Sequence, residues 1–593
     1  MSSSNNAAVK EKNKLGSLVK SFKPYYVPFI VSVILLLISV VYMILTPGSI
    51  RDLTNAISPK PGYTGIFHIN FTNVFNLGIR LISYIAISFL GGFLSGFILN
   101  TIIQKYSRDL REGISHKINR MPLDYFDTTQ TGDILSIVTN DVDTLGTSLQ
   151  NSVNMLIQSG ITLIGVIIAM FIACWQMAIV VLISLPLMLI IIFITFRFAL
   201  PLFDKNQQTL GKVNARVEEN YSGQIVIKAF NSEDRKISEF EEDNSLLGRI
   251  LYRSQAIGGM IEPAMSFVSY LTYAAVLIVG GVLYAKGVIK DIGVITGFLI
   301  YVSLFQEPLA QIGQASSTIQ LGTAACNRVF TFLEREELPD ESHKKQLLDH
   351  NNIRGEVEFK NVSFGYDPAK LTIKSFSEKI KPGMKVAIIG PTGAGKTTLV
   401  NLLMRFYEVT GGDILVDGVS IQDMSMEELR DVFGMILQET WVINGSLREN
   451  IIFNLQGVSE ERLNEILEET NLSHFVSTLP DGIDTVIKKD SALSAGQKQL
   501  VTIARAMAEN APMLILDEAT SNVDTRTEIL IQKAMDNLTK GRTSFVIAHR
   551  LSTIKNSDLI IVMKDGNVVE TGNHDSLMAL GGLYSEIYNS QFN

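Results

Sequence analysis

The sequence predicts two fused parts: an N-terminal membrane domain of six transmembrane α-helices with long intracellular extensions, and a C-terminal α/β domain. Three observations predict this fold class. Long runs without charged residues lie almost entirely before about residue 320. After that point, short apolar strand patterns alternate with helical patterns. A glycine-rich loop joins one of those strands to a helix. At 593 residues the chain is also too long for a single compact core.

Six segments of the first part are long and apolar enough to cross a membrane, because about 20 apolar residues span roughly 30 Å of hydrocarbon. Charged residues are rare in all of them. We expect the crossings at residues 25–50, at 81–104, twice within 144–196, at 263–285 and at 291–316. Trp175, in the turn expected between the two middle crossings, suits the membrane interface.

The loops between these spans differ in length and in charge. Segments of about 40–55 residues join the second span to the third and the fourth to the fifth, and their helical periodicity predicts helices that continue beyond the membrane. These segments and the N-terminal tail carry 19 Lys and Arg residues, against 5 in the loops on the other side. Both termini are therefore expected in the cytoplasm. Long intracellular helices suit a transporter that contacts a cytoplasmic motor, and a plain membrane anchor is the alternative.

Composition excludes several other classes of protein. The net charge is −8 and there is no long basic run, so we expect no nucleic acid partner. The only two cysteines, Cys174 and Cys326, exclude a disulfide framework and do not have a metal-ligand spacing. Residues 1–24 are polar and rich in lysine, and we interpret them as a cytoplasmic tail and not as a signal peptide.

The strongest motif lies in the second part, where the strand pattern 385–389 runs into a glycine-rich loop followed by a helix. This is the order that a phosphate-binding loop requires, because glycines let backbone N–H groups converge on phosphate oxygens and the helix N-terminus favours anions. Lys396 is expected to reach the β- and γ-phosphates of ATP, and the Thr397 hydroxyl to bind Mg²⁺. The loop residues expected to bind ATP are Gly390, Thr392, Gly393, Ala394, Gly395, Lys396, Thr397 and Thr398.

Two more buried strand patterns end in polar residues. One ends at Asp517 and Glu518, where Asp517 would face the metal directly or through water and Glu518 could polarise the attacking water. The other, 544–548, ends at His549. Surface carboxylates and a structural histidine are the alternatives. Three strands that each deliver a polar residue from a carboxyl end nevertheless predict one convergent site at the edge of a parallel sheet.

A short motif about 20 residues before Asp517, Leu493 to Gln497, resembles the signature of ABC transporters, with alanine at a position that is often glycine. The resemblance implies that Ser494, Ala495, Gly496 and Gln497 contact an ATP molecule held by the phosphate loop of a second chain. It further implies that Tyr366 stacks on adenine, that Gln438 senses Mg²⁺, and that His549 contacts the γ-phosphate.

The membrane part carries a second resemblance. Residues 122–127 and 132–134 are similar to the first intracellular loop of ABC exporters, and Glu218, Gly223 and residues 227–230 to the second, which in that family docks on the partner's ATPase domain. Importers of the superfamily usually lack these loops and keep the two parts on separate chains. The implied fold is an ABC exporter membrane domain fused to an α/β P-loop ABC ATPase domain. The expected boundaries are tail 1–24, transmembrane domain 25–331, linker 332–353 and nucleotide-binding domain 354–593.

One departure from the family pattern concerns the stretch before the signature. Exporters of this family often have a glutamate there that helps couple ATP closure to the loops, whereas this chain has Lys488. The coupling contact is therefore in doubt, although Asp490 is a possible substitute. The complete phosphate loop and Glu518 indicate that this chain's own site hydrolyses ATP.

The sequence contains one phosphate loop and one signature. The resemblance therefore implies a second half-transporter chain, and we favour a heterodimer over a homodimer because the chain is most similar to the intact-site subunit of heterodimeric bacterial multidrug exporters. An integral protein of the bacterial plasma membrane is implied.

The expected function is ATP-driven efflux of amphipathic or lipophilic compounds by alternating access, with ATP hydrolysis coupled to transport. Glu262 and Glu307 lie in or near the last two spans, where they either attract cationic substrates or are interfacial charges at helix ends. A lipid flippase and a peptide exporter are alternatives, although no protease domain is expected before the first span. An ATP-gated channel or a regulatory subunit is an alternative of another class.

Overall fold

The computed structural model describes residues 14–58, 69–349, 352–367, 370–438, 440–487, 493–517, 524–548 and 551–592. The chain forms two compact units. The first unit is Met1–Arg120 with Thr129–Glu336, and the second is Met121–Thr128 with Glu337–Asn593.

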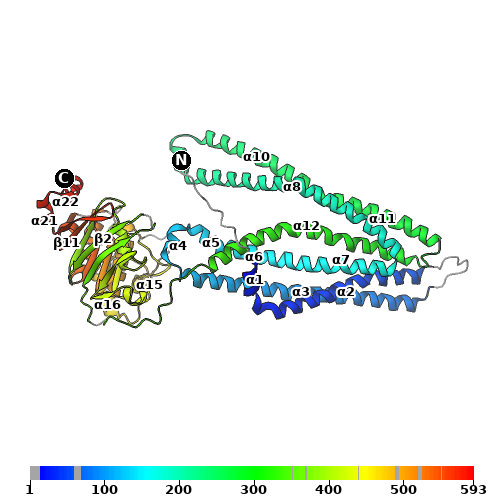
Figure 1. Ribbon diagram of the computed structural model, residues 1–593, viewed down its shortest axis with the longest axis horizontal. Helices are drawn as coiled ribbons and strands as arrows, with labels where there is room; N and C mark the ends of the chain where they lie inside the picture. The colour runs from blue at the N-terminus through cyan, green and yellow to red at the C-terminus, as the bar shows by residue number, and fades with distance from the viewer. Residues whose placement is uncertain are drawn as a thin grey trace. The chain divides into compact units, whose positions relative to one another are not determined.

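The first unit is entirely helical in its described part, and its long helices run side by side (Figure 1). Its α-helices are α1 Leu15–Ser21, α2 Tyr26–Ile57, α3 Phe71–Ile118, α5 Thr131–Ser136, α6 Val142–Ser148, α7 Asn154–Ala173, α8 Trp175–Ser222, α9 Gln224–Ala229, α10 Glu233–Gly259, α11 Ile261–Ala285 and α12 Gly293–Leu333. Short turns of other helix types are η1 Lys23–Tyr25, which is 3₁₀, and η2 Ile137–Asp141 and η3 Leu149–Val153, which are π-helical.

Five segments of the described chain are long and apolar enough to span a membrane. They are Lys23–Ile57, Phe71–Ile118, Thr131–Ala173, Trp175–Ser222 and Glu233–Ala285. The sixth expected span corresponds to α12, whose apolar stretch Gly293–Leu309 is shorter. The predicted fold class is confirmed: a helical membrane domain precedes an α/β domain on one chain.

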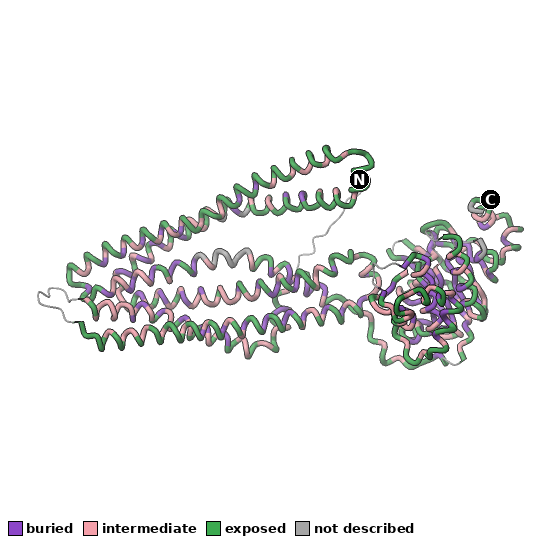
Figure 2. Tube along the Cα trace, turned by 180° about the vertical axis from the view of Figure 1, so that it is seen from behind, coloured by how far each residue is buried: buried purple, intermediate pink, exposed green. Residues whose placement is uncertain are grey.

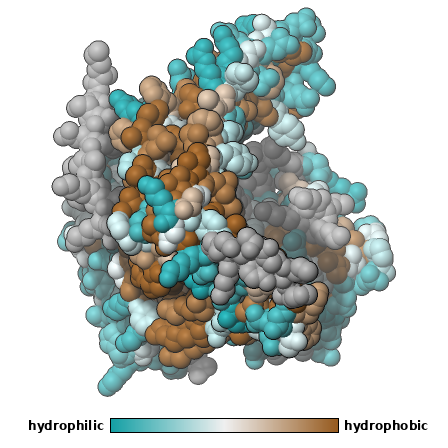
Figure 3. All heavy atoms as spheres, turned by 90° about the vertical axis from the view of Figure 1, so that its right-hand side faces the viewer, coloured by the Kyte–Doolittle hydropathy of each residue, from teal (hydrophilic) through white to brown (hydrophobic). Residues whose placement is uncertain are grey.

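The helices pack in two groups. Helices α2, α3, α7 and α12 form one group, whereas α8, α10 and α11 pack mainly on one another (Figure 1). In α10, all of which is described, only Ile250 and Ser254 are buried (Figure 2). In the space-filling view, which looks onto the ends of the long helices, apolar side chains form a large patch among hydrophilic ones (Figure 3).

A buried core holds the helical unit together, with Val166, Met170, Met177, Phe298 and Phe305 among its fully buried side chains. Glycine permits the closest approach. A Cβ atom at Gly293, the first residue of α12, would lie 2.2 Å from the carbonyl oxygen of Arg51 in α2. Small residues allow such approaches between membrane helices.

The second unit is built on two main sheets. The six-stranded sheet has the order β12-β11-β3-β10-β9-β6, in which β12 is antiparallel and the other strands are parallel. Its strands are β3 Lys385–Ile389, β6 Phe433–Ile436, β9 Met513–Asp517, β10 Thr543–Ile547, β11 Leu559–Lys564 and β12 Asn567–Gly572. The other sheet, in the order β2-β1-β4-β5, is antiparallel, with β1 Val357–Phe364, β2 Ile373–Ile380, β4 Gly411–Val416 and β5 Val419–Ser420. The strands expected from the sequence are present.

Helices of the second unit cover the parallel sheet. They are α13 Lys396–Leu403, α14 Met426–Asp431, α15 Leu447–Ile452, α16 Glu460–Glu469, α17 Ser473–Ser477, α18 Ala495–Glu509, α19 Thr525–Thr539, α20 Leu551–Lys555, α21 His574–Leu580 and α22 Leu583–Phe592. A 3₁₀ turn, η4 Gly482–Asp484, and a two-stranded antiparallel sheet of β7 Gly445–Ser446 and β8 Val486–Ile487 complete the unit. One buried cluster lies between the two main sheets and another beneath the helices that include α16, α18 and α19.

Helix α4, Leu123–Thr128, belongs to the second unit although the residues on either side of it belong to the first. Its Asp127 carboxylate accepts a hydrogen bond from the hydroxyl of Tyr407. Tyr125 is buried. The first of the two loops identified from the sequence thus contributes one helix to the second unit.

Candidate nucleotide-binding site

The loop between β3 and α13 has the backbone course of a phosphate-binding loop. Gly390, Gly393 and Gly395 have φ angles of +151°, +81° and +103°. A Cβ at Gly390 would lie 2.2 Å from the Met563 carbonyl oxygen, and one at Gly395 would lie 2.9 Å from Ile373 Cδ1. Only glycine fits these constraints without strain, so the sequence of this loop specifies its path.

The ammonium of Lys396 folds back over this loop. Its Nζ donates to the carbonyl oxygens of Gly390, at 2.7 Å, and of Pro391, at 3.2 Å. Burial lowers the pKa of Lys396, and the negative charge of Asp517 opposes that shift. A half-buried cation at a helix N-terminus fits a group with several negative oxygens, such as a triphosphate. The donor set of the loop therefore fits ATP.

Strand order brings the expected polar residues to one edge of the sheet. The strands β3, β10, β9 and β6 are neighbours and parallel, so their carboxyl ends lie together. The phosphate loop follows β3, Asp517 ends β9, and Gln438 follows β6 by two residues. Glu518 and His549 lie outside the described residues, immediately after Asp517 and two residues after the end of β10.

The residues expected to hold Mg²⁺ fit an ion that keeps most of its waters. Thr397 and Gln438 are exposed, and Asp517 is half-buried. Within the described ranges, no three His, Cys, Asp or Glu side chains form a metal cluster. Mg²⁺ usually takes only one or two protein ligands and completes its shell with water and substrate phosphates. The sparse ligand set is therefore suited to Mg²⁺ brought with a nucleotide.

Tyr366, expected to stack on adenine, lies beside helix α13. Its hydroxyl is 3.3 Å from the Thr398 hydroxyl, and its ring is 52% exposed. It meets the rings of Phe364 and Tyr407 edge-on, with centroids 5.0 Å away in both cases. Tyr366 thus contacts both Thr398, at the end of the phosphate loop, and the ring of Tyr407.

Tyr407 is a further residue beside the site that no sequence motif identifies. Its hydroxyl bonds to Asp127 of α4 while its ring packs against Tyr366. Burial, together with the hydrogen bond to Asp127, raises the pKa of Tyr407. Tyr407 therefore connects α4 to the residues of the nucleotide site. Tyr407 and Asp127 are 280 residues apart in the sequence, so no local motif could predict their contact.

The signature residues form the N-terminus of the 15-residue helix α18. The Ser494 hydroxyl accepts the backbone N–H of Gln497 at 3.2 Å, and the Gln497 side chain accepts the N–H of Ser494 at 2.9 Å. Ala495 is exposed and Gly496 is buried. Because the hydroxyl acts as an acceptor in this capping box, its own hydrogen is available to an anion at the helix N-terminus. Lys488 and Asp490, before the signature, lie outside the described residues.

Comparisons with known proteins agree with this geometry. The family model described as ABC transporter transmembrane region matches residues 29–309, and the model described as ABC transporter matches residues 373–521. A fatty acid ABC transporter ATP-binding/permease protein of Mycobacterium bovis is 42% identical over 83% of this chain and 77% of its own length.

Two further relatives have similar coverage. An ATP-dependent lipid A-core flippase of Syntrophus aciditrophicus is 35% identical over 84% of this chain and 83% of its own length. A probable multidrug resistance ABC transporter ATP-binding/permease protein of Bacillus subtilis is 35% identical over 83% of this chain and 72% of its own length. The chain, with its membrane helices and its ATPase domain fused, belongs to the ABC transporter superfamily as an exporter-type half-transporter that hydrolyses ATP.

Proposed function

We propose that this chain is one subunit of a two-chain exporter that moves amphipathic or lipophilic compounds across the membrane by alternating access. The observation that carries the proposal is the presence, on one chain with apolar spans, of a formed phosphate loop and an exposed signature terminus. ATP binds the closed pair of ATPase domains better than the open pair, and that difference in affinity drives the helices.

Within the ATP site, the proposed roles follow from position. Lys396 and the loop from Gly390 to Thr398 hold the phosphates, and Tyr366 stacks on adenine. Glu518 polarises the attacking water and His549 contacts the γ-phosphate. Thr397 and Gln438 would hold Mg²⁺, with Asp517 acting through water, and the ion would neutralise charge on the phosphates.

A second chain completes the site with its own signature, so that Ser494, Ala495, Gly496 and Gln497 of this chain serve the partner's ATP. Exposed apolar side chains at helix α9 support this pairing, since Ile225 is 86% and Phe230 76% exposed. Such a patch fits the docking of this loop on the partner's ATPase domain. We favour a heterodimer, in a bacterial plasma membrane, with both termini in the cytoplasm.

Lipid flipping is a second candidate, and the relatives support it. One is named for a fatty acid and another for lipid A-core flipping. Lipids and lipophilic drugs both combine an apolar body with a polar group, so either class would enter from the bilayer. For either class of substrate, Glu262 and Glu307 would either attract cationic groups of the substrate or lie as charges at the membrane interface.

Replacement Glu518→Gln tests the catalytic proposal. The amide cannot accept the proton of the attacking water, so ATPase activity is expected to fall at least about a hundredfold. Binding of ATP should persist, because the loop and Lys396 are unchanged. A suitable control is Glu427→Gln, an exposed carboxylate in the first turn of α14. Full ATPase activity in the Glu518→Gln protein would refute the assignment.

A further inference from the structure

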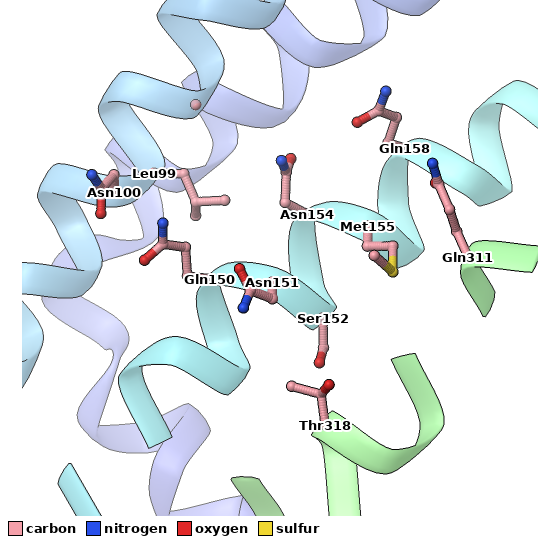
Figure 4. Close-up of a pocket in the computed structure, with 11 residues that line it drawn as sticks. Leu99, Asn100, Gln150, Asn151, Ser152, Asn154, Met155, Gln158, Gln311 and Thr318 are labelled. Atoms are coloured by element: carbon pink, nitrogen blue, oxygen red, sulfur yellow. The ribbon is translucent and has the colours of Figure 1, made fainter. Parts of the chain in front are cut away.

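A pocket of about 430 Å³ lies inside the helical unit, between α3, η3, α7 and α12 (Figure 4). This volume is in the range of small-molecule sites. Eight of its eleven lining residues are polar, and none of the described lining residues is ionisable. Six of the polar residues are carboxamides: Asn100, Gln150, Asn151, Asn154, Gln158 and Gln311.

The π-helical turn η3 directly precedes α7 and places part of this wall. It contains Gln150, Asn151 and Ser152, and α7 continues the same wall with Asn154 and Gln158. In Figure 4 these side chains come from neighbouring turns, with Gln150 beside Asn100 of α3 and Ser152 directed towards Thr318 of α12. π-helical turns inside longer helices occur frequently at functional sites.

Most polar groups of this wall have no side-chain partner among the residues that the structure describes. Five of the amides, all except Gln311, form no side-chain hydrogen bond with another residue in the part of the chain that the structure describes. Ser152 is 5% exposed, and its hydroxyl also has no partner among the described residues. Polar groups kept unpaired among membrane helices cost free energy unless water or a ligand satisfies them.

Gln311 is the exception, because its side chain is hydrogen-bonded to a carboxylate and to a hydroxyl outside the lining of the pocket. Its Nε2 donates to Glu307 at 3.1 Å, while its Oε1 accepts from Ser159 at 2.9 Å. The Glu307 carboxylate thus lies one hydrogen bond behind the wall and is not among the residues that line the pocket. A wall of this kind offers many donors and acceptors but no counter-charge for an ion.

We propose that this pocket binds the uncharged, hydrogen-bonding head group of an amphipathic substrate, with hydroxyl or amide groups. The proposal rests on the proposed export function and names the head group for which the pocket is suited. Charged head groups are disfavoured, because burying an ion without a counter-charge costs far more than burying a hydrogen-bonded neutral group.

The test uses the full-length transporter, as it assembles, in lipid nanodiscs and without ATP. Four amphipaths with the same twelve-carbon tail are bound below their micellar concentrations: a maltoside, an N-acyl diglycinamide, a trimethylammonium salt and a sulfate. Dissociation constants are read by thermophoresis, and stimulation of ATPase activity is measured afterwards. At least one uncharged probe is expected to bind about tenfold more tightly than either charged probe. Comparison of the maltoside with the diglycinamide then shows whether the pocket prefers hydroxyl or amide head groups.

Variants locate that binding. The double replacement Asn154→Leu with Gln158→Leu is expected to weaken the uncharged probes about tenfold, since each lost hydrogen bond is worth roughly 1 kcal/mol. The replacement Asn76→Leu, near the N-terminal end of α3 and not among the lining residues, should change nothing. Gln158→Glu should gain affinity for the trimethylammonium probe, a gain that misfolding cannot produce.

Several outcomes would overturn the inference. Equal binding of all four probes, tighter binding of a charged probe, or unchanged binding in the double variant would each do so. A loss of dimers in the double variant would show instead that a helix of the partner fills the pocket. If no amphipath binds or stimulates ATPase activity, the proposed export function itself fails, whereas binding of charged probes alone refutes only the head group.

Discussion

Glycines of the phosphate loop are required for two different reasons. At Gly390 another part of the backbone leaves no room for a Cβ atom, because the Met563 carbonyl would lie 2.2 Å from it. At Gly393 there is open space, and only the φ angle of +81° demands glycine. The first constraint concerns packing of the unit, while the second concerns the path of the loop around its ligand.

The replacement Gly393→Ala separates loop geometry from general stability. Alanine at this positive φ is expected to cost about 1–2 kcal/mol, and relaxation of the loop should weaken ATP binding at least about tenfold. Gly457→Ala is the matched control, since Gly457 has φ +80° and equally open surroundings but lies away from the loop. Melting temperatures and the affinity for a fluorescent ATP analogue are the measurements. Equal ATP affinity in both variants would contradict the role of Gly393.

At the scale of elements, the sequence predicts those features that depend on residues close together in the chain. The order of strand, glycine loop and helix at residues 385–403 is a contiguous motif, and the strands around Asp517 and His549 are continuous apolar runs. Strand neighbours then follow from the usual rules for parallel sheets, so the convergence of the loop with Asp517 and Gln438 was within reach of the sequence.

Contacts between distant segments were beyond the sequence. The bond between Tyr407 and Asp127, and the membership of α4 in the second unit, depend on how separate segments pack. The π-helical turns η2 and η3 could not be predicted either, because their residues have the same mixture of apolar and polar side chains as the helices around them. The segment 332–353, read as a linker for want of an apolar period, makes side-chain contacts with the ATPase unit through Glu341.

Glu341 links the segment 332–353 to the rest of the ATPase unit through ion pairs and a backbone hydrogen bond. Its carboxylate pairs with Arg405 at 2.7 Å and Lys344 at 2.9 Å, and it accepts the N–H of Met426 at 2.8 Å. Burial raises the pKa of Glu341, but the hydrogen bonds from Lys344, Arg405 and Met426 outweigh it and hold the pKa below its usual value. The depressed pKa means that this stabilisation is present above the pKa of the unfolded chain and is lost as the pH falls through the folded value.

The replacement Glu341→Gln should therefore destabilise the protein in a pH-dependent way. At pH 7 it leaves the buried Arg405 with less compensation, and the loss is expected to be about 2–4 kcal/mol. As the pH falls through the depressed pKa of Glu341, wild type and variant should converge, because the wild-type carboxylate then becomes protonated. Thermal unfolding of the full chain at pH 7 and at a series of acid pH values measures this. A difference that does not shrink in acid would exclude the ion pair as its cause.

At the scale of the whole molecule, one chain contains only half of each proposed ATP site. The phosphate loop follows β3, and the signature begins α18, so the two motifs of one chain serve different ATP molecules in the family arrangement. Pairing with a second chain would also bury apolar side chains such as Phe230, which is exposed in the single chain.

Under the proposed pairing with a different chain, this chain purified alone is expected to hydrolyse ATP slowly. Co-expression with a second half-transporter chain should raise the rate at least about tenfold, because the partner's signature supplies the donors that complete the charge-stabilising site around the γ-phosphate. Native mass and ATPase rate together measure this. A chain that is fully active alone and runs as a dimer would instead be a homodimer. In that case a mixture of Lys396→Ala and Ser494→Ala chains should regain activity that neither has separately, since mixed dimers keep one intact site.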